Sequence, residues 1–113
     1  LSIEQSARAQ LIFQQGSAGK AACVACHGGD LRGNAITIPS LRGLSATYIT
    51  AQLGAWQTNT RHARSPDCMA DVAKSLSGAD IDAVAHWIAS VNEEMLEAKP
   101  PLEPLPVECG AVQ

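Results

Sequence analysis

The chain has 113 residues and a mass of 11.8 kDa, the size of one small domain, which leaves no room for a catalytic barrel, a two-domain dehydrogenase or a doubly wound nucleotide-binding sheet. Apolar residues make up 46% of the sequence but aromatic residues only 4%, so the rings are too few for a large core and something else is expected to fill the middle of the fold. The formal net charge of −3 argues against nucleic acid as a partner, and no apolar run approaches the roughly 20 residues of a membrane-spanning helix.

The first predicted helix covers residues 2–15. Ser2 lies three residues before Gln5, which is the spacing of a capping box at the start of a helix. Apolar residues then follow at helical intervals: Ala7, Leu11, Ile12 and Phe13. Gly16 ends the pattern, and the small residues of 16–22 predict a loop.

A middle helix of about three turns is predicted after a long loop at residues 28–44, where glycine and proline interrupt regular structure. Ser45 or Thr47 can cap the N-terminus of this helix. The spacing of three large apolar residues places them on one helix face: Ile49, Leu53 and Trp56.

Two more helices are predicted in the second half of the chain. A polar run at residues 57–66 precedes a short helix over residues 69–76, with Asp67 as a possible cap. Ser77 and Asp80 form a second capping-box pattern. An apolar stripe of helical period follows it: Ile81, Val84, Ala85, Ile88 and Val91.

The C-terminal stretch differs in composition from the rest of the chain. Four of the six prolines lie at residues 100–106, and proline favours extended, helix-free backbone. We find no internal repeat and no alternating strand pattern. The sequence therefore predicts an all-α domain at residues 1–98, followed by a proline-rich tail at residues 99–113 that lies along the surface.

The segment from Cys23 to His27 reads C-x-x-C-H, which is the attachment pattern for c-type haem. Two cysteines three residues apart lie on one helical turn, from which their sulfurs reach the two vinyl groups of a porphyrin as thioethers. The next side chain then directs its imidazole at the iron. The pattern predicts one haem c, covalently bound through Cys23 and Cys26, with His27 as the proximal iron ligand.

Other readings of the motif are weaker. A thioredoxin-type pair belongs near a βαβ pattern, and no predicted strand precedes Cys23. A structural zinc site needs a second pair of ligands; His62 and Cys68 are available, but a histidine directly after the second cysteine is not the usual zinc arrangement. A chance match without chemistry is the remaining alternative.

A haem that only moves electrons needs a second axial ligand, for which methionine is the usual choice in electron-carrying cytochromes. Met69 lies at a loop-to-helix junction 42 residues after His27, far enough along the chain to reach the other face of a porphyrin. Met95 lies beyond the last predicted helix. The histidine alternative is His62, in a loop; we interpret His86, beside the apolar stripe, as a surface or partly buried structural residue. A Cys68 thiolate is a further alternative, although a disulfide is favoured for this cysteine. We predict Met69.

These segments resemble the small bacterial class I cytochromes c, and are most similar to the single-haem halves of bacterial dihaem cytochromes, over about residues 7–91. The haem motif is the specific part of the resemblance, and four weaker segments follow in the family's order. The matching segments are residues 23–28, 38–43, 48–53, 69–77 and 80–90. The resemblance implies an all-α cytochrome c fold, with about four to five helices wrapped around one covalently attached haem.

The resemblance also implies roles for individual residues. It assigns the Pro39 carbonyl as acceptor of the Nδ1 proton of the proximal histidine, although a proline here is also a plain loop breaker. It places Leu41 among the haem contacts, and Trp56 and Arg61 where such proteins contact the haem propionates. Phe13 and Trp87 resemble the packing pair at the crossing of the first and last helices.

Cys68 and Cys109 remain once the haem motif is accounted for. They form an even pair in a protein whose cofactor is usually attached outside the cytoplasm, so we predict a disulfide that tethers the tail beside Met69. Two free thiols are the alternative. We also predict a periplasmic location. The first residue is Leu and not Met, which fits a mature protein after signal-peptide removal but equally fits a truncated chain.

The predicted function is single-electron transfer between redox protein partners that the sequence does not identify, by a monomer or a subunit of a redox complex, and not enzymatic catalysis. A haem domain of a larger redox enzyme and a gas-binding haem sensor or peroxidase-like catalyst are the alternatives. Residues 1–74 carry a net charge of +3 and residues 75–113 carry −6, which suggests a dipolar molecule. Four arginines near the expected haem favour an acidic partner surface: Arg32, Arg42, Arg61 and Arg64.

Overall fold

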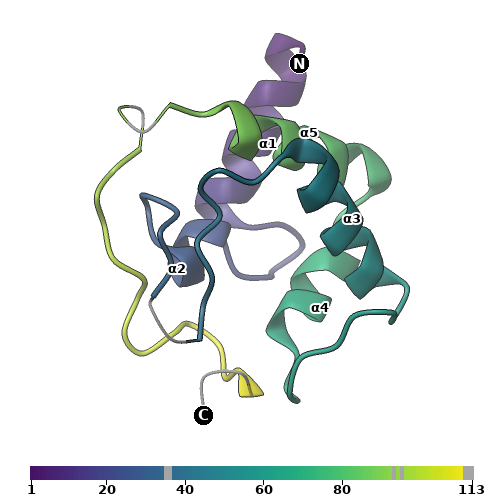
Figure 1. The fold of residues 1–113 in the computed structure, drawn as a ribbon, viewed down its shortest axis with the longest axis vertical. Coiled ribbons are helices and arrows are strands. Elements are labelled where there is room, and N and C mark those ends of the chain that lie inside the picture. The colour runs from purple at the N-terminus through teal and green to yellow at the C-terminus, as the bar shows by residue number, and fades with distance from the viewer. Residues whose placement is uncertain (35–36, 93, 95, 111–113) are drawn as a thin grey trace.

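The computed structural model describes residues 1–34, 37–92, 94 and 96–110. Five α-helices and no strand occur in these ranges, which confirms the all-α prediction (Figure 1). The helices are α1 (Ile3–Gln15), α2 (Cys23–His27), α3 (Ala46–Gln57), α4 (Cys68–Lys74) and α5 (Gly78–Ser90). None of the helices in the described part of the chain has the length and apolar character that crossing a bilayer requires.

Both predicted capping boxes form. The Ser2 hydroxyl accepts a hydrogen bond from the Gln5 amide at 3.0 Å, and the Gln5 side chain accepts one from the Ser2 amide at 2.7 Å. Ser77 and Asp80 repeat this exchange at the start of α5. Each box satisfies amide groups that have no partner within the helix, so the starts of the two longest helices are fixed by local sequence.

The two intermediate helices also begin at side-chain caps. Ser45, rather than Thr47, caps α3 by accepting from the Tyr48 amide at 3.1 Å. Asp67 caps α4 by accepting from the Ala70 amide at 3.1 Å. Helix α4 begins one residue earlier than the spacing predicts, at the residue directly after its cap.

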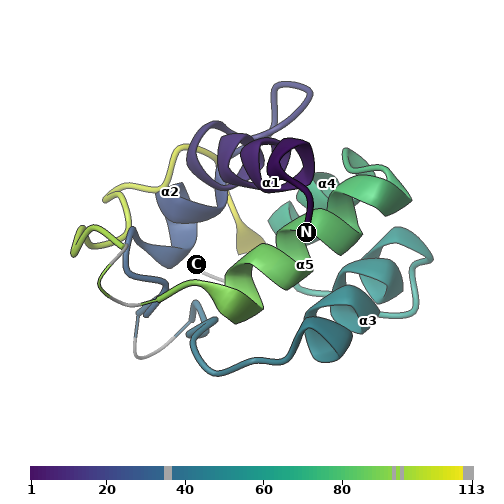
Figure 2. The same ribbon diagram turned by 90° about the horizontal axis from the view of Figure 1, so that it is seen from above.

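The core forms where α5 packs between α1 and α3 (Figure 2). At the α1–α5 crossing the rings of Phe13 and Trp87 lie 4.7 Å apart, centroid to centroid, at a tilt of 50°. The most deeply buried large side chains come from different segments: Ile12, Leu31 and Val84. Helix α4 packs against α3, and α2 against α1, so the two helices that carry the candidate site are attached to this frame.

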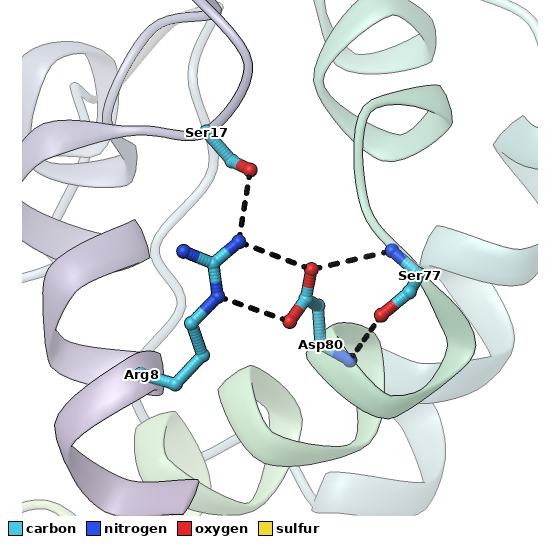
Figure 3. A network of polar contacts seen from close by, with 4 residues as sticks. All are labelled: Arg8, Ser17, Ser77 and Asp80. Carbon is cyan, nitrogen blue, oxygen red and sulfur yellow. Dashed lines mark hydrogen bonds and ion pairs between the residues drawn. The ribbon is translucent and has the colours of Figure 1, made fainter.

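A polar network joins α1 to the first turn of α5. The guanidinium of Arg8 donates to both carboxylate oxygens of Asp80, at 3.2 and 3.3 Å, and also to the Ser17 hydroxyl (Figure 3). This hydrogen-bonded guanidinium holds the pKa of the Asp80 carboxyl below its usual value. The pair therefore joins the first helix to the last across 72 residues of sequence.

Residues 97–110, called the strap below, return from α5 past α2 without forming an α-helix or a strand (Figure 1). The Gly29 amide donates to the Lys99 carbonyl at 2.8 Å, and the Leu102 amide donates to the Ala25 carbonyl at 2.9 Å. The second of these bonds ends between the two cysteines of the haem motif. The strap is thus attached by its backbone to the motif helix.

The far end of the strap is attached beside α4. A disulfide joins Cys109 to Cys68, the first residue of α4, and the Gly110 amide donates to the Pro66 carbonyl at 3.0 Å. Any side chain at Gly110 would collide with the backbone carbonyls of residues 64 and 65, so the chain needs glycine at this close approach. The strap therefore links the haem-motif segment to the segment that carries Met69.

Candidate functional site

The two motif cysteines lie on α2 and are not bonded to each other. Burial raises the pKa of the Cys23 thiol to about 11, and burial also raises the pKa of Cys26. Catalytic disulfide-exchange pairs have the opposite property, a lowered thiol pKa. Together with the all-helical surroundings, this direction of shift argues against the thioredoxin-type alternative.

His27 ends α2 and is buried, with 7% of its surface exposed. Its Nδ1 atom lies 3.0 Å from the carbonyl oxygen of Pro39. A carbonyl oxygen only accepts, so Nδ1 carries the proton and Nε2 of the neutral ring keeps its lone pair. Burial lowers the His27 pKa and outweighs the opposing effect of this hydrogen bond, so the ring is held in the neutral form that a metal ligand requires.

The loop that carries Pro39 is hydrogen-bonded to the motif helix and within itself. The Gly33 amide donates to the His27 carbonyl at 2.7 Å, and the Leu41 amide donates to the Leu31 carbonyl at 2.8 Å. Gly33 has φ +64°, and a side chain there would collide with the carbonyl oxygen of Pro39. Glycine is required at this position, because the backbone passes the histidine's hydrogen-bond partner too closely for a Cβ atom.

Trp56 and Arg61 lie together at the C-terminal end of α3. The guanidinium carbon of Arg61 lies 4.1 Å from the centroid of the Trp56 ring, and its Nη1 donates to the Gln52 side-chain oxygen. The indole Nε1 of Trp56 is buried and has no hydrogen-bond acceptor among the described residues. Such a donor costs about 1–3 kcal/mol when it stays unpaired. A bound group with a carboxylate, such as haem, would supply the missing acceptor, so this corner fits the cofactor.

Met69 is the second residue of α4 and packs, half-buried, against the core. Leu41 packs against the same core. The other ligand candidates differ: His62 and His86 are exposed, and Nδ1 of His86 lies 2.8 Å from the Asp82 carbonyl on its own helix. Met95 lies outside the described residues.

The alternative of a Cys68 thiolate as iron ligand conflicts with the disulfide. Cys68 is bonded to Cys109, so neither sulfur is a free thiol in this structure. Across the described ranges no group of three or more His, Cys, Asp or Glu side chains is placed to hold a metal ion, as a zinc site would need.

Comparison with known proteins decides the family. The cytochrome c family profile matches residues 6–92. The chain belongs to the cytochrome c family. This membership confirms both the predicted fold and the predicted cofactor, because domains of this family carry covalently bound haem c.

Two named relatives show where the cytochrome domain recurs. The chain is 40% identical over 72 residues to the thiosulfate dehydrogenase electron acceptor of Stutzerimonas stutzeri, a match that covers 64% of this chain and 33% of that protein. It is 38% identical over 68 residues to cytochrome c-554(548) of Halomonas halodenitrificans, which covers 60% of this chain and 82% of that protein. The match thus spans about a third of the first relative and most of the second.

Solved structures share the cytochrome fold. Reduced recombinant cytochrome c4 from Pseudomonas stutzeri superposes with a TM-score of 0.70 at 28% identity, over 80% of this chain and 50% of that one. Thiosulfate dehydrogenase from Marichromatium purpuratum, in its as-isolated form, superposes with a TM-score of 0.70 at 30% identity, over 80% of this chain and 20% of that one.

Sequence reasoning missed two contacts at this site. Gln52, which accepts from Arg61, carries no signal beyond its place on a polar helix face. The backbone bond between Leu102 and Ala25 has no sequence signal, because it depends on the path of the strap and not on side-chain type. The first contact joins residues nine positions apart, and the second joins the strap to the motif helix.

Proposed function

We propose that this cytochrome is a single-electron carrier in which Cys23 and Cys26 form the thioethers, and His27 and Met69 are the axial ligands. The observation that carries the proposal is the His27 ring, which is buried, neutral and oriented by the Pro39 carbonyl with Nε2 left free. Haem bound here supplies a one-electron couple between ferrous and ferric iron.

The residues around the cofactor have separate tasks. The Pro39 carbonyl fixes the orientation and the tautomer of His27 and increases the basicity of its free nitrogen. Trp56 and Arg61 donate to the propionates, and Leu41 contributes apolar surface that excludes water. Two neutral ligands on fixed segments keep the site similar in both oxidation states, which favours rapid electron exchange.

The ligand assignment is tested by the optical spectrum of the ferric holoprotein. We expect a sulfur-to-iron charge-transfer band, and no carbon monoxide binding by the reduced protein at neutral pH. Met69→Ala removes the band and opens the iron to carbon monoxide, whereas Met95→Ala and His62→Ala leave both properties unchanged. A band that survives Met69→Ala assigns the sulfur ligand elsewhere. Carbon monoxide binding by the unmodified protein would support the gas-sensor alternative.

A second candidate function is electron transfer as a subunit of a larger redox complex. It is supported by the relatives named as electron acceptors of thiosulfate dehydrogenase and by the structural similarity to part of a thiosulfate dehydrogenase. The test is mixing the purified holoprotein with a thiosulfate-oxidising enzyme. Thiosulfate-dependent reduction of its haem within a complex that survives gel filtration supports this function, and reduction without stable association supports a diffusing carrier.

We place the working protein outside the cytoplasm, with residues 1–98 as the cytochrome domain and residues 99–113 as its tail. The Cys68–Cys109 disulfide supports an oxidising compartment. An acidic docking surface on the partner is a further part of the proposal. Arg64 and Arg32 are both exposed, although Arg32 lies 3.8 Å from the Asp30 carboxylate, and Arg61 stacks on tryptophan. Electron-transfer rates that do not change with ionic strength would exclude electrostatic steering.

A further inference from the structure

Gln57, the last residue of α3, makes a contact that the site described above does not use. Its half-buried side-chain amide nitrogen donates to the Ala73 carbonyl at 2.9 Å and to the Leu76 carbonyl at 2.8 Å. Both hydrogens of the amide are thereby directed at backbone oxygens at the C-terminal end of α4 and just beyond it. One side chain of α3 thus serves as the C-terminal cap of another helix.

Helix α4 depends on such external contacts. It has seven residues, well below the length at which a helix is stable alone. The carbonyls of Val72 and Ala73 in its last turn accept from the amides of Ser75 and Leu76, which lie beyond the helix, so this end closes by short turns and by Gln57. Its N-terminal end is held by the Asp67 cap and by the disulfide at Cys68. Gln57 holds the opposite end, so Met69 lies on a short segment that is fixed on both sides.

The geometry also connects two parts of the cofactor site. Gln57 directly follows Trp56, the indole proposed to bind a propionate. Ala73, which accepts from Gln57, lies four residues after Met69 and therefore on the same helix face, one turn away. A displacement of α4 along α3 would move the Met69 sulfur relative to a haem held by Trp56.

We propose that Gln57 is a positioning residue, which keeps the Met69 turn in register with α3 and so keeps the sulfur on the iron. This inference rests on the proposed function, in which Met69 is the distal ligand. It assigns to Gln57 a role in ligand retention in addition to its contribution to folding.

A natural control exists in the same helix pair. Lys74, the last residue of α4, donates from its Nζ to the Asn59 side chain at 2.8 Å, beyond the end of α3. Both groups are exposed, so this bond joins the same two segments across solvent and contributes little. Lys74→Ala therefore removes one link between α3 and α4 but leaves Gln57 bonded to the Ala73 and Leu76 carbonyls.

The test compares Gln57→Glu, Gln57→Met and Lys74→Ala as holoproteins. Glu keeps the shape of Gln57 but, when ionised, directs oxygens at two carbonyl oxygens; Met keeps the volume and removes both donors without adding charge, in case the first variant fails to fold. We expect a weakened sulfur-to-iron band and an affinity of the ferric protein for added imidazole that rises about tenfold in both Gln57 variants. Lys74→Ala should stay within about twofold of the unmodified protein.

The outcomes distinguish failure of this inference from failure of the Met69 ligand assignment on which it rests. If the unmodified protein has the band and the Gln57 variants lose thermal stability with no change in band or imidazole affinity, Gln57 is only structural and the inference is overturned. If the unmodified protein itself lacks the band, the ligand assignment fails and this inference fails with it. The side chain of Asn is shorter than that of Gln and does not reach both carbonyls at the observed distances. If a Gln57→Asn variant kept the band and the imidazole affinity of the unmodified protein, these two hydrogen bonds would not be what holds Met69, and the inference would also be overturned.

Discussion

The helical frame and the strap side of this cytochrome are held together in different ways. In the frame, α1, α3 and α5 bury large apolar side chains against one another, with the Phe13–Trp87 pair at the main crossing. On the strap side, the motif helix and the start of α4 are joined by single backbone hydrogen bonds and one disulfide. The frame is specified by hydrophobic burial, which many side chains share, whereas the strap side depends on a few contacts that cannot replace one another.

The difference lies in how the segments of each region meet. The frame is packed by side chains that touch one another directly across the α1–α5 and α3–α5 contacts. The segments that carry His27 and Met69 are joined through the strap, whose described ties are the Leu102–Ala25 hydrogen bond at one end and the Cys68–Cys109 disulfide at the other. Breaking one contact in each region therefore tests the comparison.

The largest expected loss comes from the frame. Phe13→Ala removes a ring that is only 2% exposed and loses its contact with Trp87, so we expect the free energy of unfolding to fall by about 4 kcal/mol. Leu11→Ala, on the same helix but 43% exposed, should change it by less than about 0.5 kcal/mol. Chemical denaturation of the holoproteins measures both. Equal effects of the two variants would contradict the assignment of the core to this crossing.

The strap gives the next largest effect. Replacing Cys68 and Cys109 together by serine opens a covalent loop whose ends are 41 residues apart, which corresponds to about 4 kcal/mol in the chain-entropy treatment and to less where the native structure compensates. We expect about 3 kcal/mol, with faster hydrogen exchange at the Gly110 and Leu102 amides. Hydrogen exchange at the buried α5 amides should become faster only to the extent that the free energy of global unfolding falls. If the α5 amides lost protection against hydrogen exchange before the strap amides did, the frame and the strap side would not be stabilised independently.

The smallest effect concerns the Arg8–Asp80 pair on the outside of the frame. Because the folded protein lowers the Asp80 pKa, the pair stabilises fully above the ordinary aspartate pKa of about 4 and loses this contribution as the pH falls through the lowered value. Asp80→Asn should therefore melt lower than the unmodified protein near neutral pH, and the two melting curves should converge in acid. Arg8→Gln should give the same pattern. Curves that stay parallel at every pH would exclude the pair as the cause.

Local chemistry made much of the frame predictable. Ser2, Ser45, Asp67 and Ser77 mark the four longer helix starts, because a capping side chain acts within three residues of itself. Helical periodicity in the same way identifies the buried face of α5. The family-defining motif is equally local, since its chemistry requires the cysteines and the histidine to lie on one turn.

The contacts that orient the site were less accessible to sequence reasoning. The hydrogen bonds of Gln57 to α4 and the backbone bonds of the strap join segments with no shared period, and a glutamine or a backbone amide looks the same whether it is solvated or paired. The Pro39 contact was expected only through resemblance to a family, because nothing in a proline predicts which imidazole its carbonyl will meet.

The bond between Cys68 and Cys109 has one more consequence. It encloses α4, α5 and the strap in a single covalent ring, so a protease that cuts once anywhere inside the ring leaves both fragments attached. A nicked molecule would keep its full mass until a reductant separates the pieces. Survival after such damage is thus built into a stretch of chain that holds both the central helix of the core and the strap.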